Sequence, residues 1–298
     1  MTHTTRPVYH ACTHRAGTAP RRPGSVWATA QHQSRAQRTG RYIPASTAHP
    51  AKMLPAIARH MIRAYTRPGD LVIDPMCGIG TTLVEAVHLG RNALGVEYEK
   101  QWATLAEANL THARKQQASG HGTVINADAR KLPEIAPADA LGKAALLITS
   151  PPYGASVHGH IRSTKESGER GVAKFNHRYS ADRGNLAHRP RAELVEGFAE
   201  ILRGARPLLR PGGIIAITAR PWREHGELVD LPTDVINAGI QAGLEPIDRC
   251  AALIAGVRDK QLVARPSFFQ ILVLRRAAES GTTAHLVAHE DVLIFRNP

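Results

Sequence analysis

The sequence predicts an α/β fold built on a doubly wound, mostly parallel sheet. Short apolar runs rich in β-branched residues alternate with segments whose apolar residues recur at helical spacing. Such alternation is typical of a parallel sheet covered by helices on both faces. With 298 residues, 43% of them hydrophobic, the chain can bury one large domain core.

The individual elements follow in chain order. Apolar residues such as Met53, Ile57 and Met61 recur at helical spacing before a turn at residues 67–70. Residues 268–275 form an apolar run that periodicity cannot assign to a helix or a strand. Strands are expected at 71–73, 93–96, 123–127, 144–148, 214–218, 247–254 and 292–295, and helices at 50–65, 83–89, 100–117, 193–209 and 232–242.

Charge and composition divide the chain into an arm and a domain. Residues 1–44 are rich in Arg, His and Pro with little apolar periodicity, so they predict a basic flexible arm before a domain over 45–298. Residues 154–192 are polar and carry eight Lys or Arg against three acids. A loop of this length in a compact domain is usually functional or disordered. We expect it to be a nucleic-acid recognition insertion.

The formal net charge of +13 favours a polyanionic partner, and nucleic acid is the natural one. The first 69 residues carry 11 positive charges and no acid. A solvated basic tail, or an Arg-rich composition without function, is the alternative. The three cysteines lie far apart, which argues against disulfides and structural zinc. Because no apolar run has membrane-spanning length and no signal-peptide core is present, we expect a cytoplasmic protein without membrane contact.

Acidic residues follow three successive predicted strands. Asp74 begins a loop after the first strand that contains Gly78 and Gly80, where open α/β sheets bind ligands. Glu97 ends the second strand, in a position to accept hydrogen bonds from ribose hydroxyls, and Asp128 ends the third. Each feature alone is compatible with an ordinary turn or polar strand end. Together they predict an adenosine-containing cofactor.

The fourth predicted strand ends in Ser150-Pro151-Pro152-Tyr153. The two prolines remove N–H donors and stiffen the loop, so its carbonyl groups stay free. An exocyclic base amine is a poor nucleophile, and acceptors for both of its N–H bonds would aim its lone pair at a methyl donor. The hydroxyl of Ser150 and the carbonyl of Pro151 are such acceptors, and Tyr153 offers a stacking face for a flipped base. A rigid turn or polyproline ligand is the structural alternative.

These motifs resemble those of the amino-methyltransferases that modify cytosine N4 or adenine N6 in DNA. The similarity extends from His49-Pro50-Ala51-Lys52 to the segment 289–295. It implies the class I methyltransferase fold, a Rossmann-like sheet of seven strands with an antiparallel last strand, and S-adenosylmethionine as cofactor. Catalytic residues carried over from the motif are Ser150, Pro151, Pro152 and Tyr153. Expected cofactor-binding residues are His49, Lys52, Asp74, Pro75, Met76, Cys77, Gly78, Gly80, Thr81, Glu97, Asp128 and Ala129.

Two departures from the family pattern concern recognition and packing. Met76 stands where the family more often has Phe, and the large target-recognition region of many restriction-modification members is missing. Residues 154–192 are the expected substitute. Arg162, Lys165, Arg170, Lys174 and Arg178 are candidate phosphate contacts there, although a solvated loop explains them as well.

Ser150 favours cytosine N4 as the acceptor, because relatives acting on adenine N6 or on guanine N2 in RNA more often carry Asp or Asn at this position. Adenine-N6 methylation of DNA, amino-group methylation of RNA and a non-catalytic nucleic-acid-binding role remain alternatives. Methylation at C5 needs a nucleophilic cysteine after a proline, which this chain lacks. The pair His158 and His160 has no third ligand nearby, so no metal is expected. The sequence leaves open the recognition site, any partner endonuclease and the oligomeric state.

Overall fold

The computed structural model of the protein has one eight-stranded sheet as its central feature. Its order is β4-β3-β2-β5-β8-β14-β11-β1. Five neighbouring strands, β4 to β8 in this order, run parallel, and β14 lies antiparallel between β8 and β11. The described residues are 24–49, 51–152, 160–163, 172–175, 185–224, 227–265, 268–279 and 281–298. The strands of the sheet are β1 Val26–Trp27, β2 Leu71–Asp74, β3 Asn92–Glu97, β4 Gly122–Asn126, β5 Ala144–Thr149, β8 Leu209–Ala219, β11 Glu245–Leu253 and β14 His289–Arg296.

The sheet confirms the predicted mostly parallel α/β fold of class I methyltransferases, with its antiparallel last strand. It has one strand more than expected. The extra strand, β1, pairs parallel with β11 through Val26 and Trp27. A strand of two residues has no periodicity for sequence analysis to detect.

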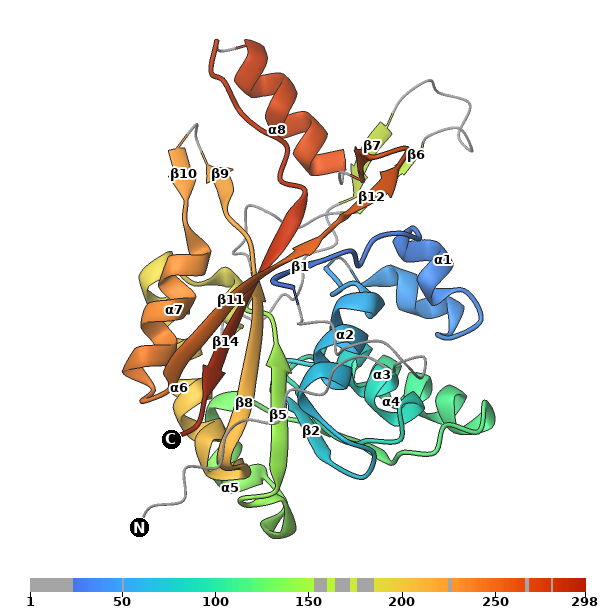
Figure 1. Ribbon diagram of the computed structural model, residues 1–298, viewed down its shortest axis with the longest axis vertical. Coiled ribbons are helices and arrows are strands. Elements are labelled where there is room, and N and C mark those ends of the chain that lie inside the picture. Colours follow the sequence, from blue (N-terminus) through green and yellow to red (C-terminus); the bar gives the residue numbers. More distant parts are fainter. Residues whose placement is uncertain are drawn as a thin grey trace, which may run out of the picture.

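Helices cover both faces of the sheet (Figure 1). Helices α2, α3 and α4 lie on one face, and α5, α6 and α7 lie on the other. This three-layer arrangement follows from parallel strands, whose connections must cross over the sheet. The helices are α1 Ser34–Arg38, α2 Pro55–Tyr65, α3 Thr81–His88, α4 Lys100–Lys115, α5 Leu132–Ile135, α6 Arg191–Ala205, α7 Leu231–Gln241 and α8 Phe268–Glu279.

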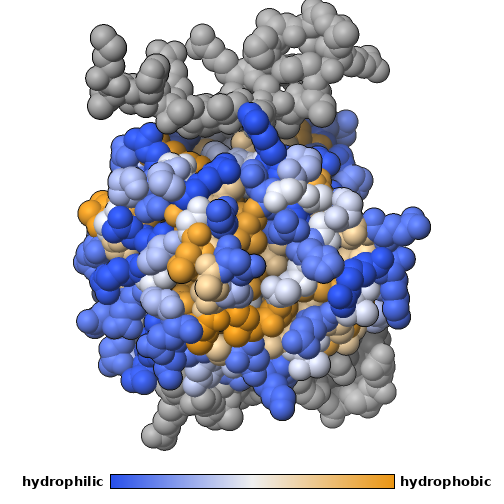
Figure 2. Space-filling model, turned by 90° about the horizontal axis from the view of Figure 1, so that it is seen from below, coloured by the Kyte–Doolittle hydropathy of each residue, from blue (hydrophilic) through white to orange (hydrophobic). Residues whose placement is uncertain are grey.

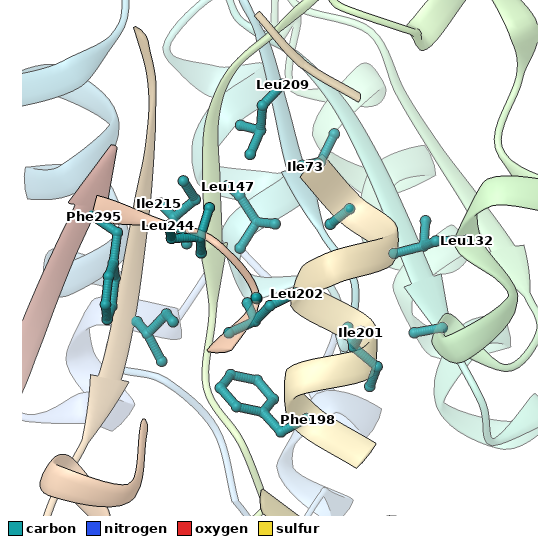
Figure 3. Packing of buried hydrophobic residues seen from close by; sticks show 14 of the residues in the cluster. Ile73, Leu132, Leu147, Phe198, Ile201, Leu202, Leu209, Ile215, Leu244 and Phe295 are labelled. Atoms are coloured by element: carbon teal, nitrogen blue, oxygen red, sulfur yellow. The ribbon is translucent and has the colours of Figure 1, made fainter. Parts of the chain in front are cut away.

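The core is divided between the two faces. On one face, α6 directs Phe198 and Leu202 toward β5, β8 and β14 (Figure 3). On the other, α2 packs against β5, α3 against β2 and β3, and α4 against β3 and β4. Phe198 and Phe295 are each only 1% exposed. These buried layers hold the strand ends in a fixed position.

The N-terminal region differs from the predicted flexible arm. Residues 1–23 lie outside the described residues, but 24–49 pack on the domain. The ring of Trp27 stacks on that of His60, with centroids 4.1 Å apart, and Tyr42 is 5% exposed. Burial of these aromatic rings provides the apolar contact that the composition of this region did not suggest. The domain division as a whole stays a prediction.

Hairpins and one helix extend beyond the carboxyl ends of the parallel strands (Figure 1). The unassigned apolar run forms most of α8. Within the predicted recognition insertion, β6 and β7 pair antiparallel, and its remaining residues up to 184 lie outside the described residues. No helix among the described residues is long and apolar enough to cross a membrane. The hairpin strands are β6 His160–Ser163, β7 Val172–Phe175, β9 Trp222–Glu224, β10 Glu227–Val229, β12 Ala255–Arg258 and β13 Gln261–Ala264.

The opposite end of the molecule, at the amino ends of the parallel strands, has a mostly hydrophilic surface with hydrophobic residues gathered near its centre (Figure 2). The pocket described next is at the other end.

Candidate cofactor pocket and active site

A pocket opens at the carboxyl ends of β2, β3, β4 and β5. Its empty volume is about 860 Å³, counted with its opening to solvent. Ligands bind at this edge in open α/β sheets. Its lining includes most of the predicted cofactor residues, namely His49, Lys52, Asp74, Pro75, Met76, Cys77, Gly78, Thr81, Glu97, Asp128 and Ala129, together with Ser150 and Pro152 of the proline loop.

The loop between β2 and α3 forms the floor of the pocket. Its start is held by the N–H of Met76, which donates to Asp74 Oδ1 at 3.1 Å. The N–H of Cys77 donates to the carbonyl of Val96 at 2.9 Å, which ties the loop to β3. Gly80, at the N-terminus of α3, has a φ of 78° and is not among the lining residues. The sequence predicted that Gly80 binds the cofactor. In the structure its left-handed φ serves the turn into α3 instead.

Gly78 is needed where the loop approaches His49. Its φ is 53°, in the left-handed region that favours glycine, and a Cβ at this position would lie 3.0 Å from His49 Nε2. The His49 ring in turn meets the Trp102 ring edge-on, with centroids 4.6 Å apart. A side chain at residue 78 would therefore push into the pocket wall. Absence of that side chain leaves backbone accessible to a ligand.

Glu97 is 5% exposed and its carboxylate is held by two backbone groups. The N–H of Gly78 donates to Oε2 at 2.8 Å, and the N–H of Glu99 donates to Oε1 at 2.9 Å. Burial raises the pKa of Glu97 to about 7, although these two hydrogen bonds oppose the shift. Each carboxylate oxygen retains a further lone pair for ligand hydroxyls.

Asp74 is the acidic group nearest the start of the cofactor loop. Burial raises its pKa to about 6, while the hydrogen bond from the N–H of Met76 acts in the opposite direction. Asp74 is the last residue of β2, and β2 pairs directly with β5, whose last residue, Thr149, precedes Ser150. Asp74 therefore lies at the end of the strand next to the one that carries the proline loop.

Asp128 lines the pocket, but it already has a partner. Arg130 Nη2 lies 2.6 Å from Asp128 Oδ2, and the N–H of Arg130 donates to Oδ1 at 3.0 Å. Burial alone would raise the pKa of Asp128, but the hydrogen bonds and charge of Arg130 lower it. Asp128 is therefore a carboxylate at neutral pH, and its acceptor capacity is shared with Arg130.

Lys52 also lines the pocket, where its positive charge contrasts with the negative charges of the strand-end acids. Its ammonium group donates to the carbonyls of Thr47, at 3.3 Å, and His49. Burial, and then the charge of Arg38, lower its pKa to about 8. With a pKa of about 8, this half-buried ammonium group is still mostly charged at pH 7 and is suited to hold a carboxylate.

The proline loop meets the same pocket. Ser150 and Pro152 line it, while Pro151 is buried beside them. Tyr153 lies outside the described residues, so its predicted stacking role stays a prediction. The structure thus brings Ser150 into the pocket that contains Asp74 and Glu97.

Some lining residues were missed by sequence analysis, among them Tyr98, Arg130, Asn185 and Leu186. Asn185 Nδ2 donates to Glu99 Oε1 at 2.8 Å, across 86 positions of sequence. No local pattern marks such a contact. Tyr98 and Arg130 had a detectable signal, because they lie one and two residues after the predicted Glu97 and Asp128.

The predicted nucleic-acid contacts cannot be placed as side chains. Arg162 and Lys174 are on the paired strands β6 and β7, whereas Lys165, Arg170 and Arg178 lie outside the described residues. His158 also lies outside them. In the part of the chain that the structure describes, no group of three metal-ligating side chains is present.

The donor set of the pocket fits S-adenosylmethionine. It offers carboxylates for ribose hydroxyls and a sulfonium, an ammonium group for the amino-acid carboxylate, and a glycine that leaves the backbone exposed. Strand order, with the antiparallel β14 between β8 and β11, is that of the class I methyltransferase fold.

Comparison with known families supports the resemblance seen in the motifs. Residues 11–108 match the family model described as DNA methylase, N6_N4_Mtase. Among curated proteins, the chain is similar to the Type II methyltransferase M2.DpnII of Streptococcus pneumoniae, with 37% identity over 62 residues, 21% of this chain and 23% of that one. Over these segments the chain is similar to N4/N6 DNA methyltransferases, as its motifs indicated.

Other relatives act on a different nucleic acid by name. The tRNA (guanine(10)-N2)-dimethyltransferase of Methanocaldococcus jannaschii is 33% identical over 114 residues, 36% of this chain and 30% of that protein. The chain spans less than a third of the length of these curated relatives. Among solved structures, TrmN from Thermus thermophilus matches with a TM-score of 0.48 and 17% identity, over 85% of this chain and 51% of that one.

Proposed function

We propose that this protein transfers a methyl group from S-adenosylmethionine to an exocyclic amine of a flipped nucleic-acid base, with cytosine N4 in DNA as the preferred acceptor. The observation that carries the proposal is the position of Ser150 in the pocket formed by the ends of β2 and β3. The oxygen of a serine hydroxyl in a cofactor pocket can accept a hydrogen bond from an amine N–H and so position the amine.

The charges around the pocket give the cofactor one orientation. Lys52 would hold the amino-acid carboxylate, and Glu97 would accept the ribose hydroxyls. Asp74, at the end of the strand that pairs with β5, would face the positive sulfonium side. S-adenosylmethionine supplies an electrophilic methyl group in this arrangement.

Ser150 and Pro151 would prepare the acceptor. The hydroxyl of Ser150 and the carbonyl of Pro151 would accept the two N–H bonds of the amine, which turns its lone pair toward the methyl group. The prolines fix φ, so this geometry exists before the base arrives. The amine nitrogen would bond to the methyl carbon as the carbon–sulfur bond breaks, S-adenosylhomocysteine would leave, and one proton of the amine would pass to water.

The choice of DNA and cytosine N4 rests on finer features. The net charge of +13 supports a nucleic-acid substrate, and the family match supports DNA. Ser150, where many relatives carry Asp or Asn, supports cytosine. The predicted recognition segment 154–192 would then read the site.

RNA is the second candidate substrate, because two of the curated relatives are named as tRNA (guanine(10)-N2)-dimethyltransferases. Their matches cover 36% of this chain, a larger share than the 21% matched by M2.DpnII. In that case the same loop would hold guanine N2.

An acceptor assay tests the proposal. The purified chain is incubated with methyl-labelled S-adenosylmethionine and either duplex DNA of mixed sequence or a tRNA pool, and the digested nucleosides are analysed by mass spectrometry. We expect N4-methylcytosine from DNA. Methylated adenine would move the acceptor to N6, and label in tRNA alone would replace DNA by RNA. Absence of cofactor binding in calorimetry would favour a non-catalytic nucleic-acid-binding protein.

A further inference from the structure

Arg38, at the end of α1, connects two walls of the pocket. Its Nη1 donates to Thr81 Oγ1 at 3.3 Å, and its Nη2 donates to the carbonyl of Met53 at 2.5 Å. Thr81 begins α3, and Met53 follows Lys52 on the opposite wall; both line the pocket. Arg38 itself is not among the lining residues, so it acts from behind the wall.

This arginine is in an unfavourable environment for a charge. Arg38 is 8% exposed, and burial lowers its pKa, although Tyr42 and Glu85 oppose the shift. Among the described residues, no carboxylate forms an ion pair with it within 4.0 Å. Its guanidinium instead lies 4.8 Å from the centre of the Tyr42 ring. A buried cation held by neutral groups costs stability, so its hydrogen bonds must supply compensation.

A buried cluster around Glu85 fixes the segment that carries Arg38. Glu85 has a fully buried side chain, and Arg41 binds both of its oxygens at 2.7 and 2.9 Å. Arg59 on α2 donates to Oε2 at 3.0 Å, and the Tyr42 hydroxyl donates to Oε1 at 2.9 Å. We define these four residues as the Glu85 cluster. The cluster anchors the segment after α1 to α3. Arg41 and Tyr42 belong to this segment and follow Arg38 closely in the sequence, so the cluster also limits where Arg38 can lie.

We propose that Arg38 is a positioning residue for the cofactor, which holds the wall 51–53 against the start of α3 and thereby sets the ammonium group of Lys52 in the pocket. The inference rests on the proposed cofactor orientation, and it assigns a role to part of the basic N-terminal region. The charge of Arg38 also lowers the pKa of Lys52, so the two cations are close enough to influence each other.

The chemistry requires arginine at this position. A guanidinium is planar and presents donors in different directions, so one side chain reaches a hydroxyl on α3 and a carbonyl on the other wall. A lysine would keep the charge but concentrate its donors at one point. Arg38→Lys therefore separates the bridging contact from the charge, and Arg38→Met removes both.

Cofactor binding to the purified full chain, measured by calorimetry from pH 6 to 9 without any nucleic acid, tests the inference. We expect Arg38→Lys and Arg38→Met to raise the Kd for S-adenosylmethionine by about tenfold, which is about 1.4 kcal/mol. The matched control is Arg35→Met, which removes an exposed arginine from the same helix, α1, outside the Glu85 cluster and the pocket lining. Its Kd should stay within about twofold of the wild-type value.

The pH dependence separates positioning from general loss of structure. In Arg38→Met, the loss of affinity at alkaline pH should begin at a higher pH than in the wild type, because Lys52 no longer has a cation beside it. In Arg38→Lys it should begin at about the wild-type pH. Circular dichroism checks that each variant is folded, and if Arg38→Met is not, Arg38→Lys alone still tests the bridging contact.

The outcomes distinguish this inference from the proposed function. A wild-type chain that binds no S-adenosylmethionine would overturn both. Wild-type binding with an unchanged Kd in the folded Arg38 variants, or an equal loss in Arg35→Met, would overturn the inference alone. Failure to methylate either DNA or tRNA would leave the binding result intact and affect only the proposed acceptor.

Discussion

The N–H of Gly78 donates a hydrogen bond to Glu97 Oε2 at 2.8 Å, which joins the cofactor loop to the end of the neighbouring strand. The same carboxylate accepts from the N–H of Glu99 at 2.9 Å. Glu97 therefore shapes the loop as well as facing the pocket. Loss of its carboxylate should affect the cofactor in both ways.

Glu97→Ala should weaken cofactor binding by about 10-fold to 100-fold, since a hydrogen bond to a charged group contributes about 1.5–3 kcal/mol. Calorimetry with S-adenosylmethionine measures the change. The control is Glu107→Ala, which removes an exposed carboxylate from α4. Equal Kd values for Glu97→Ala and Glu107→Ala would contradict the assignment of Glu97 to the cofactor.

Ser150→Ala should reduce kcat by about 100-fold to 1000-fold, comparable to removal of one preorganised hydrogen-bonding group from an active site. The Kd for S-adenosylmethionine should change little, because Ser150 is assigned to the acceptor amine. Tyr153→Ala should instead weaken engagement of the base, with cofactor binding retained. Loss of cofactor affinity in either variant would show that the proline loop has been assigned the wrong role.

Cofactor affinity should be greatest between about pH 7 and pH 8. Below about 7, Glu97 takes up a proton in the free protein and loses the negative charge that favours the bound cofactor. Above about 8, Lys52 loses the charge assigned to the cofactor carboxylate. Calorimetric titrations across this range measure both limbs, and an affinity independent of pH would contradict the charge assignment.

Stability of the cofactor-free protein should respond to the same acids. The folded pKa values of Asp74 and Glu97, about 6 and about 7, are above their ordinary values, so the folded chain binds more protons than the unfolded chain between about pH 4 and 7. Their contribution to the free energy of unfolding is therefore present below about pH 4 and is lost as pH rises through 7. Urea titrations of the wild type and Glu97→Gln would measure it: the decrease over this range should be smaller in the variant.

Glu85→Gln should destabilise the fold by about 1.5–3 kcal/mol, because it removes the buried charged acceptor of Arg41, Arg59 and the Tyr42 hydroxyl, while the two arginines stay partly exposed to water. Urea denaturation measures the free energy of unfolding, with Glu107→Gln as the exposed control. A change below about 1 kcal/mol would mean that the Glu85 cluster does not stabilise the N-terminal segment.

Much of the pocket could be predicted because its residues directly follow recognisable strands. Asp74, Glu97 and Ser150 each end or follow an apolar run, and parallel strands bring their carboxyl ends to one edge of the sheet. Local sequence order therefore determined which side chains would meet. The antiparallel β14 came from family resemblance, since periodicity carries no information on strand direction.

Other contacts could not be predicted, because they depend on side chains that meet across the fold. Asn185 reaches Glu99 over 86 positions. The two-residue strand β1 is too short for a pattern, and the apolar run of α8 fits a helix and a strand equally.

The basic N-terminal region shows the division most clearly. The sequence by itself determined the parallel α/β fold, the strand-end acids and an excess of arginine before residue 70. Only the tertiary structure decided that Arg41 and Arg59 meet Glu85, while Arg38 bridges Met53 and Thr81. A run of positive charges specifies an overall potential, whereas the partner of each charge depends on which side chains are buried together.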